Sequence, residues 1–239
     1  MELIQGKNIL IVGATGGIGR EAAKLIKNSG GNLFLTGRDD DKLAALASEL
    51  GVPHAQTYVV DLANEADVAD LANSIHQQIG QGIDVLVNAA GIGIIKPMET
   101  LSLEDFQRSL SANLTGPFLL LKYFLPAMKE KKEGLIINLP GVLGKTPMAG
   151  AAAYAASKYG LNGMLKSVRE ELKRTNIRIT NIYLGGTDTP FWDEIDLRVQ
   201  RDKFVTAKEA GRAIWFLCQQ PDSGVVSEMV IQPFNHQAI

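Results

Sequence analysis

The chain of 239 residues is long enough for one sizeable α/β domain and short for two. Its formal net charge of −2 gives no electrostatic reason to bind nucleic acid or an anionic membrane, and its 46% of hydrophobic residues suits an ordinary globular core. The lone cysteine, Cys218, excludes an internal disulfide.

Neither a targeting segment nor a metal site is predicted. The N-terminal MELIQGK contains an acidic residue and no long apolar run, so it does not resemble a signal peptide. The most apolar stretch, 116–128, is interrupted by Lys122 and Pro126 and is shorter than the roughly 20 residues that cross a bilayer. The histidines are scattered without a second ligand nearby. We expect a cytoplasmic protein that binds no membrane.

Short aliphatic or β-branched runs alternate with longer segments of helical spacing. Strands are expected at Asn8–Val12, Leu33–Thr36, Tyr58–Val60, Val85–Asn88, Leu135–Leu139, Arg178–Tyr183 and Met229–Gln232. Helices are expected at about 18–28, 41–50, 65–79, 104–131, 152–174 and 207–219. This alternation, with continuously apolar strands, predicts an α/β fold: a doubly wound (Rossmann-type) parallel sheet of seven strands with helices on both faces. We expect residues 1–239 to form a single domain.

Binding residues are expected where the strands end, because ligands of such sheets lie beyond the carboxyl ends of the strands. Residues 185–205 break the alternation between the sixth strand and the last long helix. Unpatterned insertions of this size are often lids or binding loops, so we expect a substrate loop here.

The first strand is followed by a glycine-rich turn that opens a helix. Glycines permit a tight turn and let the backbone approach a pyrophosphate, whose charge the helix N-terminus favours. The predicted dinucleotide-binding residues of this turn are Gly13, Thr15, Gly17, Ile18 and Gly19.

The second strand ends at Gly37 and Arg38. An acidic residue at this tip would bind the adenosine ribose hydroxyls of NAD(H), whereas Arg38 suits the 2′-phosphate of NADP(H). The aspartates that follow, 39–41, fit the cap and first turn of the next helix. We expect NADP(H) as the cofactor. The alternatives are NAD(H), and an Arg38 that is purely structural.

Further cofactor contacts are expected after the third and fourth strands. The carboxylate of Asp61 could accept a hydrogen bond from an adenine amino group; the alternative is that it caps the helix before Glu65. Small residues after the fourth strand leave room for the adenosine. The predicted contacts here are Asp61, Leu62, Asn88, Ala89 and Ala90.

The motifs Gly13-x-x-x-Gly17-x-Gly19, Asp61, Asn88-Ala-Ala-Gly91, Asn113 and Tyr154-x-x-x-Lys158 occur in this order along almost the whole chain. Together they resemble the short-chain dehydrogenase/reductase family. The resemblance implies a nicotinamide cofactor, hydride transfer to or from a carbonyl, and a homotetramer or homodimer. A different Rossmann enzyme, such as a methyltransferase, is an alternative.

By this resemblance, Tyr154 is the general acid that protonates the carbonyl oxygen. A free tyrosine has a pKa of about 10, so it needs a neighbouring cation, and Lys158 lies one helical turn away. Lys158 would also hold the nicotinamide ribose, and Asn113 would hold a water beside the lysine. The contacts that the resemblance implies for the nicotinamide carboxamide are Gly185, Thr187 and Thr189.

The family's catalytic serine is absent. The resemblance implies a serine thirteen residues before Tyr154, and Gly141 stands there. Loss of one such donor costs on the order of 3 kcal/mol, or 10²–10³ in rate, which slows an enzyme without abolishing catalysis. One hypothesis is an enzyme in which a backbone N–H, a water or a substrate group replaces the serine. The other is a catalytically weakened NADP(H)-binding sensor or scaffold.

On the enzyme hypothesis, Gly141→Ser should raise kcat/KM about tenfold or more, unless the glycine holds a positive φ. The pocket is expected to be formed by residues 92–95, 142–143 and 189–192, which are mostly apolar. The predicted substrate is therefore a ketone or aldehyde with an apolar body.

Overall fold

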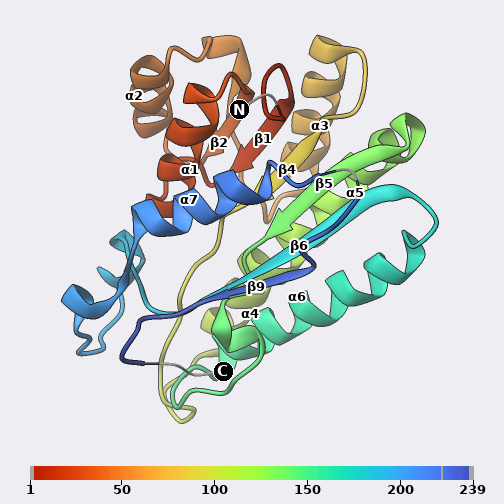
Figure 1. Cartoon of the computed structure of the whole chain (residues 1–239). Coiled ribbons are helices and arrows are strands. Elements are labelled where there is room, and N and C mark those ends of the chain that lie inside the picture. The colour runs from red at the N-terminus through yellow and green to blue at the C-terminus, as the bar shows by residue number, and fades with distance from the viewer. Residues whose placement is uncertain (1–2, 222, 237–239) are drawn as a thin grey trace.

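The computed structural model describes residues 3–221 and 223–236. Within them, seven parallel strands form one sheet in the order β3-β2-β1-β4-β5-β6-β9 (Figure 1). The strands are β1 Asn8–Val12, β2 Asn32–Gly37, β3 Thr57–Val59, β4 Val85–Asn88, β5 Glu133–Asn138, β6 Asn176–Leu184 and β9 Glu228–Ile231. The strand order reverses between β1 and β4, which opens a crevice beyond their carboxyl ends. The predicted doubly wound sheet is confirmed, with strand ends displaced by at most two residues.

Helices cover both faces of the sheet (Figure 1). The helices α1 Gly17–Asn28, α2 Asp40–Leu50 and α7 Ala207–Leu217 pack on one face. The opposite face carries α3 Glu65–Ile79, α5 Gly116–Lys131 and α6 Ala152–Glu171, with α4 Leu103–Leu110 packed against α6. Alternate strand residues divide between the two cores: Ile9 and Ile11 face α1, whereas Leu10 and Val12 face the other side. None of the described helices is long and apolar enough to cross a membrane.

The long helix expected over 104–131 is interrupted. Between α4 and α5 the residues Ser111–Thr115 form a π-helical stretch, which contains Asn113. A π-helical insertion widens one turn of an α-helix and is frequent at functional sites. Spacing of apolar residues alone does not predict it.

Two helix caps test the sequence interpretation of neighbouring acidic residues. Asp39 caps α2, because its side chain accepts a hydrogen bond from the backbone N of Lys42 at 3.0 Å, as predicted. The cap of α3 is Asn64 rather than Asp61, so the alternative interpretation of Asp61 as a helix cap is wrong. Oδ1 of Asp61 instead accepts from the backbone N of Ala63 at 2.9 Å.

The segment 185–205 has its own small framework. Its ends are held together by β7 Thr187–Asp188, which pairs in parallel with β8 Val205–Thr206. The intervening chain projects to the left of the sheet in Figure 1, beside the end of β9. The predicted loop is therefore a compact flap rather than an extended connection.

Candidate functional site

The turn between β1 and α1 presents backbone, not side chains, to the crevice. Gly13 has a φ of +76°, and a Cβ there would lie 2.8 Å from the backbone N of Ala90. A Cβ at Gly19 would lie 2.3 Å from the carbonyl oxygen of Gly13. Only glycine fits both positions, the first for the turn and the second for the close approach of α1. This cradle suits the pyrophosphate of a dinucleotide.

A cavity of about 190 Å³ adjoins this turn at the carboxyl ends of the N-terminal strands. Seven of the predicted cofactor-binding residues line it: Gly13, Thr15, Arg38, Asp61, Leu62, Ala89 and Ala90. The Arg38 side chain is exposed at the tip of β2 and, within residues 3–221 and 223–236, forms no hydrogen bond or ion pair. Its guanidinium is therefore available to an anion.

A larger cavity, of about 530 Å³, shares the wall residues Gly16 and 89–91 with the smaller one. The predicted residues that line it are Gly17, Ile18, Tyr154, Lys158, Gly185, Thr187 and Thr189. A Cβ at Gly17 would lie 2.8 Å from Cγ2 of Thr189, so the glycine turn and the segment after β6 close on each other. The two cavities together form an elongated site along the carboxyl edge of the sheet.

Tyr154 and Lys158 lie one turn apart on α6 and line the larger cavity together. Nζ of Lys158 lies 5.5 Å from the centroid of the Tyr154 ring. Burial lowers the pKa of the Lys158 ammonium to about 8, and burial raises the pKa of the Tyr154 phenol well above its ordinary value. The pair thus sets a neutral phenol beside an amine that titrates near physiological pH.

Asn113 lies behind the wall of the cavity and is fully buried. Its Nδ2 donates to the carbonyl oxygen of Ile92 and its Oδ1 accepts from the backbone N of Ile92, both at 2.9 Å. Its Nδ2 also donates to Oγ of Ser157 at 3.1 Å. Gly91 fills the space between Asn113 and Lys158, since a Cβ there would lie 2.9 Å from Oδ1 of the asparagine and 3.4 Å from Nζ of the lysine. The asparagine therefore fixes the backbone at Gly91 and Ile92, beside which Nζ of Lys158 lies.

Five predicted residues line neither cavity: Gly19, Asn88 and Asn113, together with Gly93 and Ile94 of the expected pocket segment 92–95. Asn88 is 3% exposed, and its Nδ2 donates to Oδ1 of Asn138 on the neighbouring strand at 3.3 Å. These residues hold the walls in place from behind.

Gly141 lines the larger cavity in a conformation reserved for glycine. Its φ is +70° and its ψ is 169°, a region that other residues essentially do not occupy. Its backbone N donates to the carbonyl oxygen of Ile182 at 3.4 Å, and a short 3₁₀ helix, Val142–Gly144, follows. A serine at position 141 could therefore keep the present path of the loop after β5 only in a strained backbone conformation.

The segment 185–205 is held by Arg201. Its Nε donates to Oδ1 of Asp188 at 2.7 Å and its Nη1 to Oδ1 of Asp193 at 2.6 Å. Its Nη2 donates to the carbonyl oxygen of Thr189 at 2.9 Å. The hydrogen bonds to the two carboxylates also raise the pKa of Arg201. One side chain thus fixes the backbone that carries the predicted carboxamide-binding threonines.

The lining residues that escape the sequence analysis include Thr146, Met148, Gln232 and His236, whereas Leu197, Val199 and Phe204 lie in the segment 185–205, the expected substrate loop. Thr146 and Met148 follow β5, and Gln232 and His236 follow β9, so the rule that ligands lie beyond strand ends would have found these four. The lack of pattern predicts the loop that contains Phe204 but does not single out this residue within it. The described residues contain no group of three or more His, Cys, Asp or Glu side chains that could hold a metal ion.

Comparison with known proteins identifies the family. The family model for short chain dehydrogenases matches residues 7–200. The chain is 29% identical over 233 residues to an uncharacterized oxidoreductase of Staphylococcus saprophyticus, covering 96% of this chain and 98% of that protein. It is 30% identical over 238 residues to a 3-oxoacyl-[acyl-carrier-protein] reductase of Aquifex aeolicus, and the match covers 95% of this chain and 96% of that protein.

A solved structure of a metagenomic short-chain oxidoreductase in complex with NADP matches with a TM-score of 0.83 and 29% identity, covering 98% of this chain and all of that one. With the glycine turn, the Tyr154–Lys158 pair and the strand order, these matches agree on one family. The chain belongs to the short-chain dehydrogenase/reductase family of oxidoreductases.

Proposed function

We propose that this protein is an NADP(H)-dependent oxidoreductase that interconverts a ketone or aldehyde and the corresponding alcohol. The observation that carries the proposal is the pair of Tyr154 and Lys158 lining the larger cavity, with Nζ 5.5 Å from the phenol ring. A phenol beside a cation is a proton donor whose strength the cation tunes.

The two adjoining cavities and the glycine cradle fit a dinucleotide. The pyrophosphate would lie on the glycine turn, and the adenosine in the smaller cavity beside Asp61 and Leu62. Arg38 would bind the 2′-phosphate, which favours NADP(H) over NAD(H). The nicotinamide end would lie in the larger cavity against Gly185, Thr187 and Thr189.

When bound, the dinucleotide supplies or accepts the hydride. Oη of Tyr154 donates the proton to the carbonyl oxygen in reduction and takes it back in oxidation. Because burial raises the pKa of the phenol in the free protein, proton transfer near neutral pH needs positive charge beside it, and the Lys158 ammonium provides that charge. Lys158 would also hold the nicotinamide ribose, and Asn113 would hold a water beside the lysine.

The experiment is reduction of a panel of ketones and aldehydes with NADPH, followed by the loss of NADPH absorbance. Tyr154→Phe should abolish turnover and leave NADPH binding nearly intact, because the ring stays and only the hydroxyl is removed. If the wild type turns over NADPH and Tyr154→Phe does so equally well, Tyr154 is not the acid.

A second function, that of an NADP(H)-binding sensor or scaffold, is favoured by Gly141. A site without the serine hydroxyl lacks one preorganised donor for the substrate carbonyl. Tight NADPH binding without reduction of any carbonyl in the panel would favour this second function over the first.

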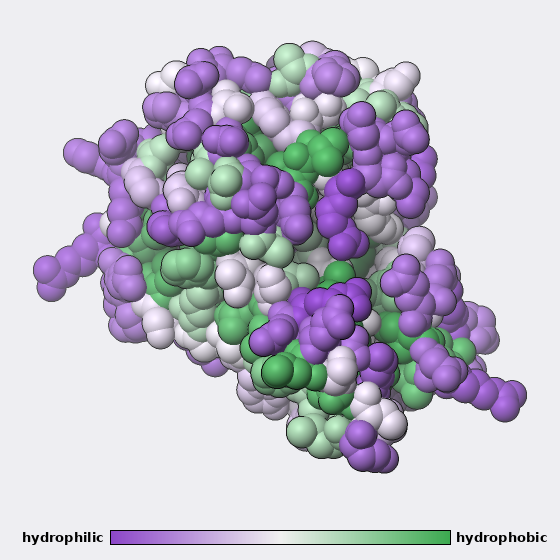
Figure 2. Space-filling model, turned by 180° about the vertical axis from the view of Figure 1, so that it is seen from behind, coloured by the Kyte–Doolittle hydropathy of each residue, from purple (hydrophilic) through white to green (hydrophobic). Residues whose placement is uncertain are grey.

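We propose that the chain assembles as a homotetramer or homodimer. Large apolar side chains are exposed on the helices of one face: Leu103 on α4 at 71%, Phe118 on α5 at 48% and Tyr159 on α6 at 44%. Figure 2 shows the rear of the molecule, where apolar side chains gather in the lower half among hydrophilic ones. Exposed apolar patches of this kind commonly mark interfaces. Light scattering at micromolar concentration tests this, and a monomer mass would contradict it.

A further inference from the structure

We propose that the substrate of this site is an uncharged carbonyl compound that carries an aromatic ring, and that Phe191, Trp192 and Phe204 select the ring. The proposal rests on the carbonyl chemistry proposed above and adds the class of substrate.

A row of aromatic rings leads away from the proposed acid. The Tyr154 and Phe191 ring centroids lie 5.8 Å apart with an interplanar angle of 54°. Phe191 and Trp192 follow at 5.4 Å and 80°, and Trp192 and Phe204 at 5.2 Å and 49°. All four side chains line the larger cavity. These spacings and tilts are those that aromatic rings prefer, so a further ring entering the row meets partners already arranged for it.

The rings are fixed in position by backbone that lacks side chains. A Cβ at Gly93 would lie 2.3 Å from Cζ of Phe191, and a Cβ at Gly186 would lie 2.7 Å from Cε1 of Phe204. The indole N–H of Trp192 donates to the carbonyl oxygen of Thr187 at 2.9 Å. Two of the rings thus pack closely against glycines, and the indole N–H of the third is hydrogen-bonded, so contacts with the protein itself hold all three rings in place.

The cavity offers no partner for an anionic substrate. Among the described residues that line it, Lys158 is the only Lys or Arg, and no Asp or Glu is present. Lys158 is 4% exposed and donates to the carbonyl oxygen of Leu139. Its charge lies beside the Tyr154 ring, where the proposed function requires it. A carboxylate or phosphate entering this wall would lose its water without gaining a counter-ion.

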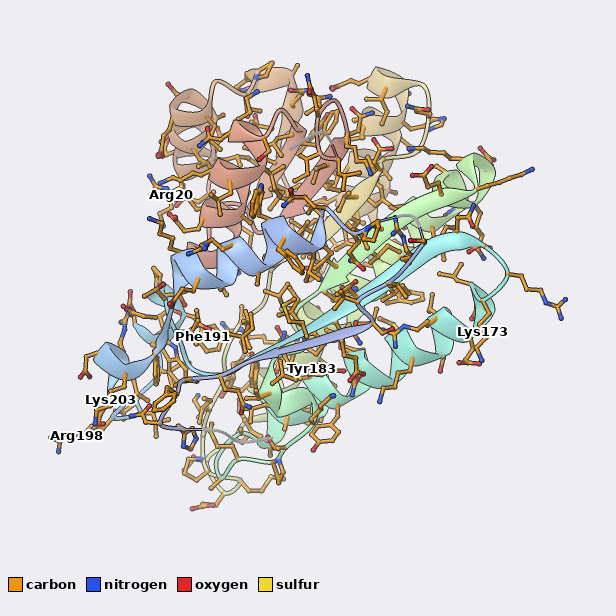
Figure 3. The ribbon with its side chains drawn as sticks, in the orientation of Figure 1. Arg20, Lys173, Tyr183, Phe191, Arg198 and Lys203 are labelled. Carbon is orange, nitrogen blue, oxygen red and sulfur yellow. The ribbon has the colours of Figure 1, made fainter. Side chains whose placement is uncertain are left out.

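The other cations of the loop are directed elsewhere. Figure 3 shows Phe191 turned inward between the loop and the sheet, whereas Arg198 and Lys203 extend to the outer edge. Arg201 is held by Asp188 and Asp193. His236 also lines the cavity but is exposed to water, where an ion pair contributes little.

The test compares matched carbonyl compounds at saturating NADPH. Decan-2-one and 4-phenylbutan-2-one have the same carbon count and differ in the ring; methyl 4-acetylbenzoate and 4-acetylbenzoate differ in charge. We expect kcat/KM to favour the phenyl ketone by about five- to tenfold and the ester over the acid by about 100-fold or more. Equal or greater turnover of decan-2-one, or of the acid, would overturn the proposal.

Phe204→Leu removes the ring at the end of the row that is farthest along it from Tyr154. It should reduce the preference for the phenyl ketone to about twofold or less while decan-2-one is still reduced. Phe216→Leu is the matched control, because Phe216 is 55% exposed on α7 and lies outside the cavity. If Phe204→Leu keeps the full preference, the aromatic row does not select the ring.

A binding measurement separates this proposal from the proposed catalysis. Calorimetric titration of the NADP⁺-saturated protein with methyl 4-acetylbenzoate and with 4-acetylbenzoate should show binding of the ester alone. If the ester binds and no ketone is reduced, the substrate class stands and the catalytic proposal fails. If the acid binds as tightly as the ester, or if neither binds, the proposed substrate class is wrong.

Discussion

Nζ of Lys158 donates a hydrogen bond to the carbonyl oxygen of Leu139 across 3.1 Å, which ties helix α6 to the loop after β5. The same nitrogen faces the ring of Tyr154. Because only 4% of Lys158 is exposed, the cost of burying its charge lowers its pKa to about 8. The ammonium is thus positioned by one backbone acceptor and remains sensitive to pH.

This sensitivity predicts the pH dependence of cofactor use. We expect kcat/KM for NADPH to fall as the pH rises through about 8, because the lysine that would hold the ribose and support the phenol loses its charge there. A pH profile of the wild type from about pH 6 to about pH 10 measures it. Lys158→Arg is the control, since a guanidinium stays charged throughout that range. A wild-type profile that stays flat above the predicted midpoint would contradict the role of Lys158.

The same burial has a consequence for stability. The pKa of Lys158 is about 8 in the folded protein and 10.5 at its ordinary value, so between these pH values the unfolded chain binds more protons and the free energy of unfolding rises with pH. Below the lower value the folded state bears the full cost of the buried charge. Lys158→Met should therefore raise the free energy of unfolding by about 1–3 kcal/mol at neutral pH, after loss of the bond to Leu139 is allowed for.

Urea unfolding of both proteins measures this effect. The advantage of Lys158→Met should shrink as the pH approaches 10.5, the ordinary pKa of lysine, because the amine in the folded wild type is then neutral and no buried charge remains. An advantage that is absent at neutral pH, or that grows with pH, would show that burial of the charge is not costly here.

The choice between the two dinucleotides rests on Arg38. Arg38→Ala should weaken NADPH binding about tenfold or more and leave NADH binding nearly unchanged, because only NADPH carries the 2′-phosphate. Arg20→Ala is the matched control: Arg20, labelled on α1 in Figure 3, is paired with Glu49 at 2.6 Å. Fluorescence titration of both variants with both dinucleotides measures the effect. Equal affinities of the wild type for NADPH and NADH would exclude the proposed preference.

Arg201 positions the loop that carries Thr187 and Thr189. We expect Arg201→Ala to raise KM for the carbonyl substrate about tenfold, with a smaller effect on kcat, because the guanidinium fixes the backbone without touching the reacting atoms. Arg201→Lys should recover little, since an ammonium cannot reproduce the three directed hydrogen bonds that Arg201 makes. Arg198 is an exposed neighbour, so Arg198→Ala should leave KM for the carbonyl substrate as in the wild type. Unchanged KM in Arg201→Ala would show that the loop is held by other contacts.

The parts of the fold that the sequence predicts are those encoded locally. Continuous apolar runs such as Ile9–Val12 identify buried parallel strands. Glycines at positions 13, 17 and 19 identify a tight turn in which backbone segments approach one another closely. The distinction between Asp61 and Asn64 as the cap of α3 escapes sequence analysis, because both are good capping residues within one turn of each other.

The walls of the site are less predictable because they depend on contacts between distant segments. Phe204 reaches the cavity only because β7 pairs with β8 and because Gly186 leaves room for the ring. Asn88 and Asn113 are recognisable by motif, yet the structure places both behind the wall, where Asn88 bonds to Asn138 on the neighbouring strand and Asn113 bonds to the backbone of Ile92. A motif marks which residues matter, and the tertiary packing decides which of them a ligand can touch.

The last prediction concerns Gly141, where the conformation changes the expectation that the sequence suggests. A Cβ at this position would meet the carbonyl oxygen of Leu184 at an ordinary 3.5 Å, so space is not the obstacle. The obstacle is the backbone, because a φ of +70° with a ψ of 169° costs any other residue about 1–3 kcal/mol. A serine placed here would either bear that strain or rotate the loop after β5 away from its present path.

We therefore expect Gly141→Ser to lower the free energy of unfolding by about 1–3 kcal/mol and to leave kcat/KM no higher than that of the wild type, rather than tenfold above it. Gly141→Ala is the matched control, because it bears the same backbone strain without a hydroxyl. The two variants should unfold at the same urea concentration and reduce the phenyl ketone at the same rate. If kcat/KM of Gly141→Ser instead exceeds that of both the wild type and Gly141→Ala by tenfold or more, the loop has adapted to the side chain. The native site then lacks a hydroxyl beside Tyr154.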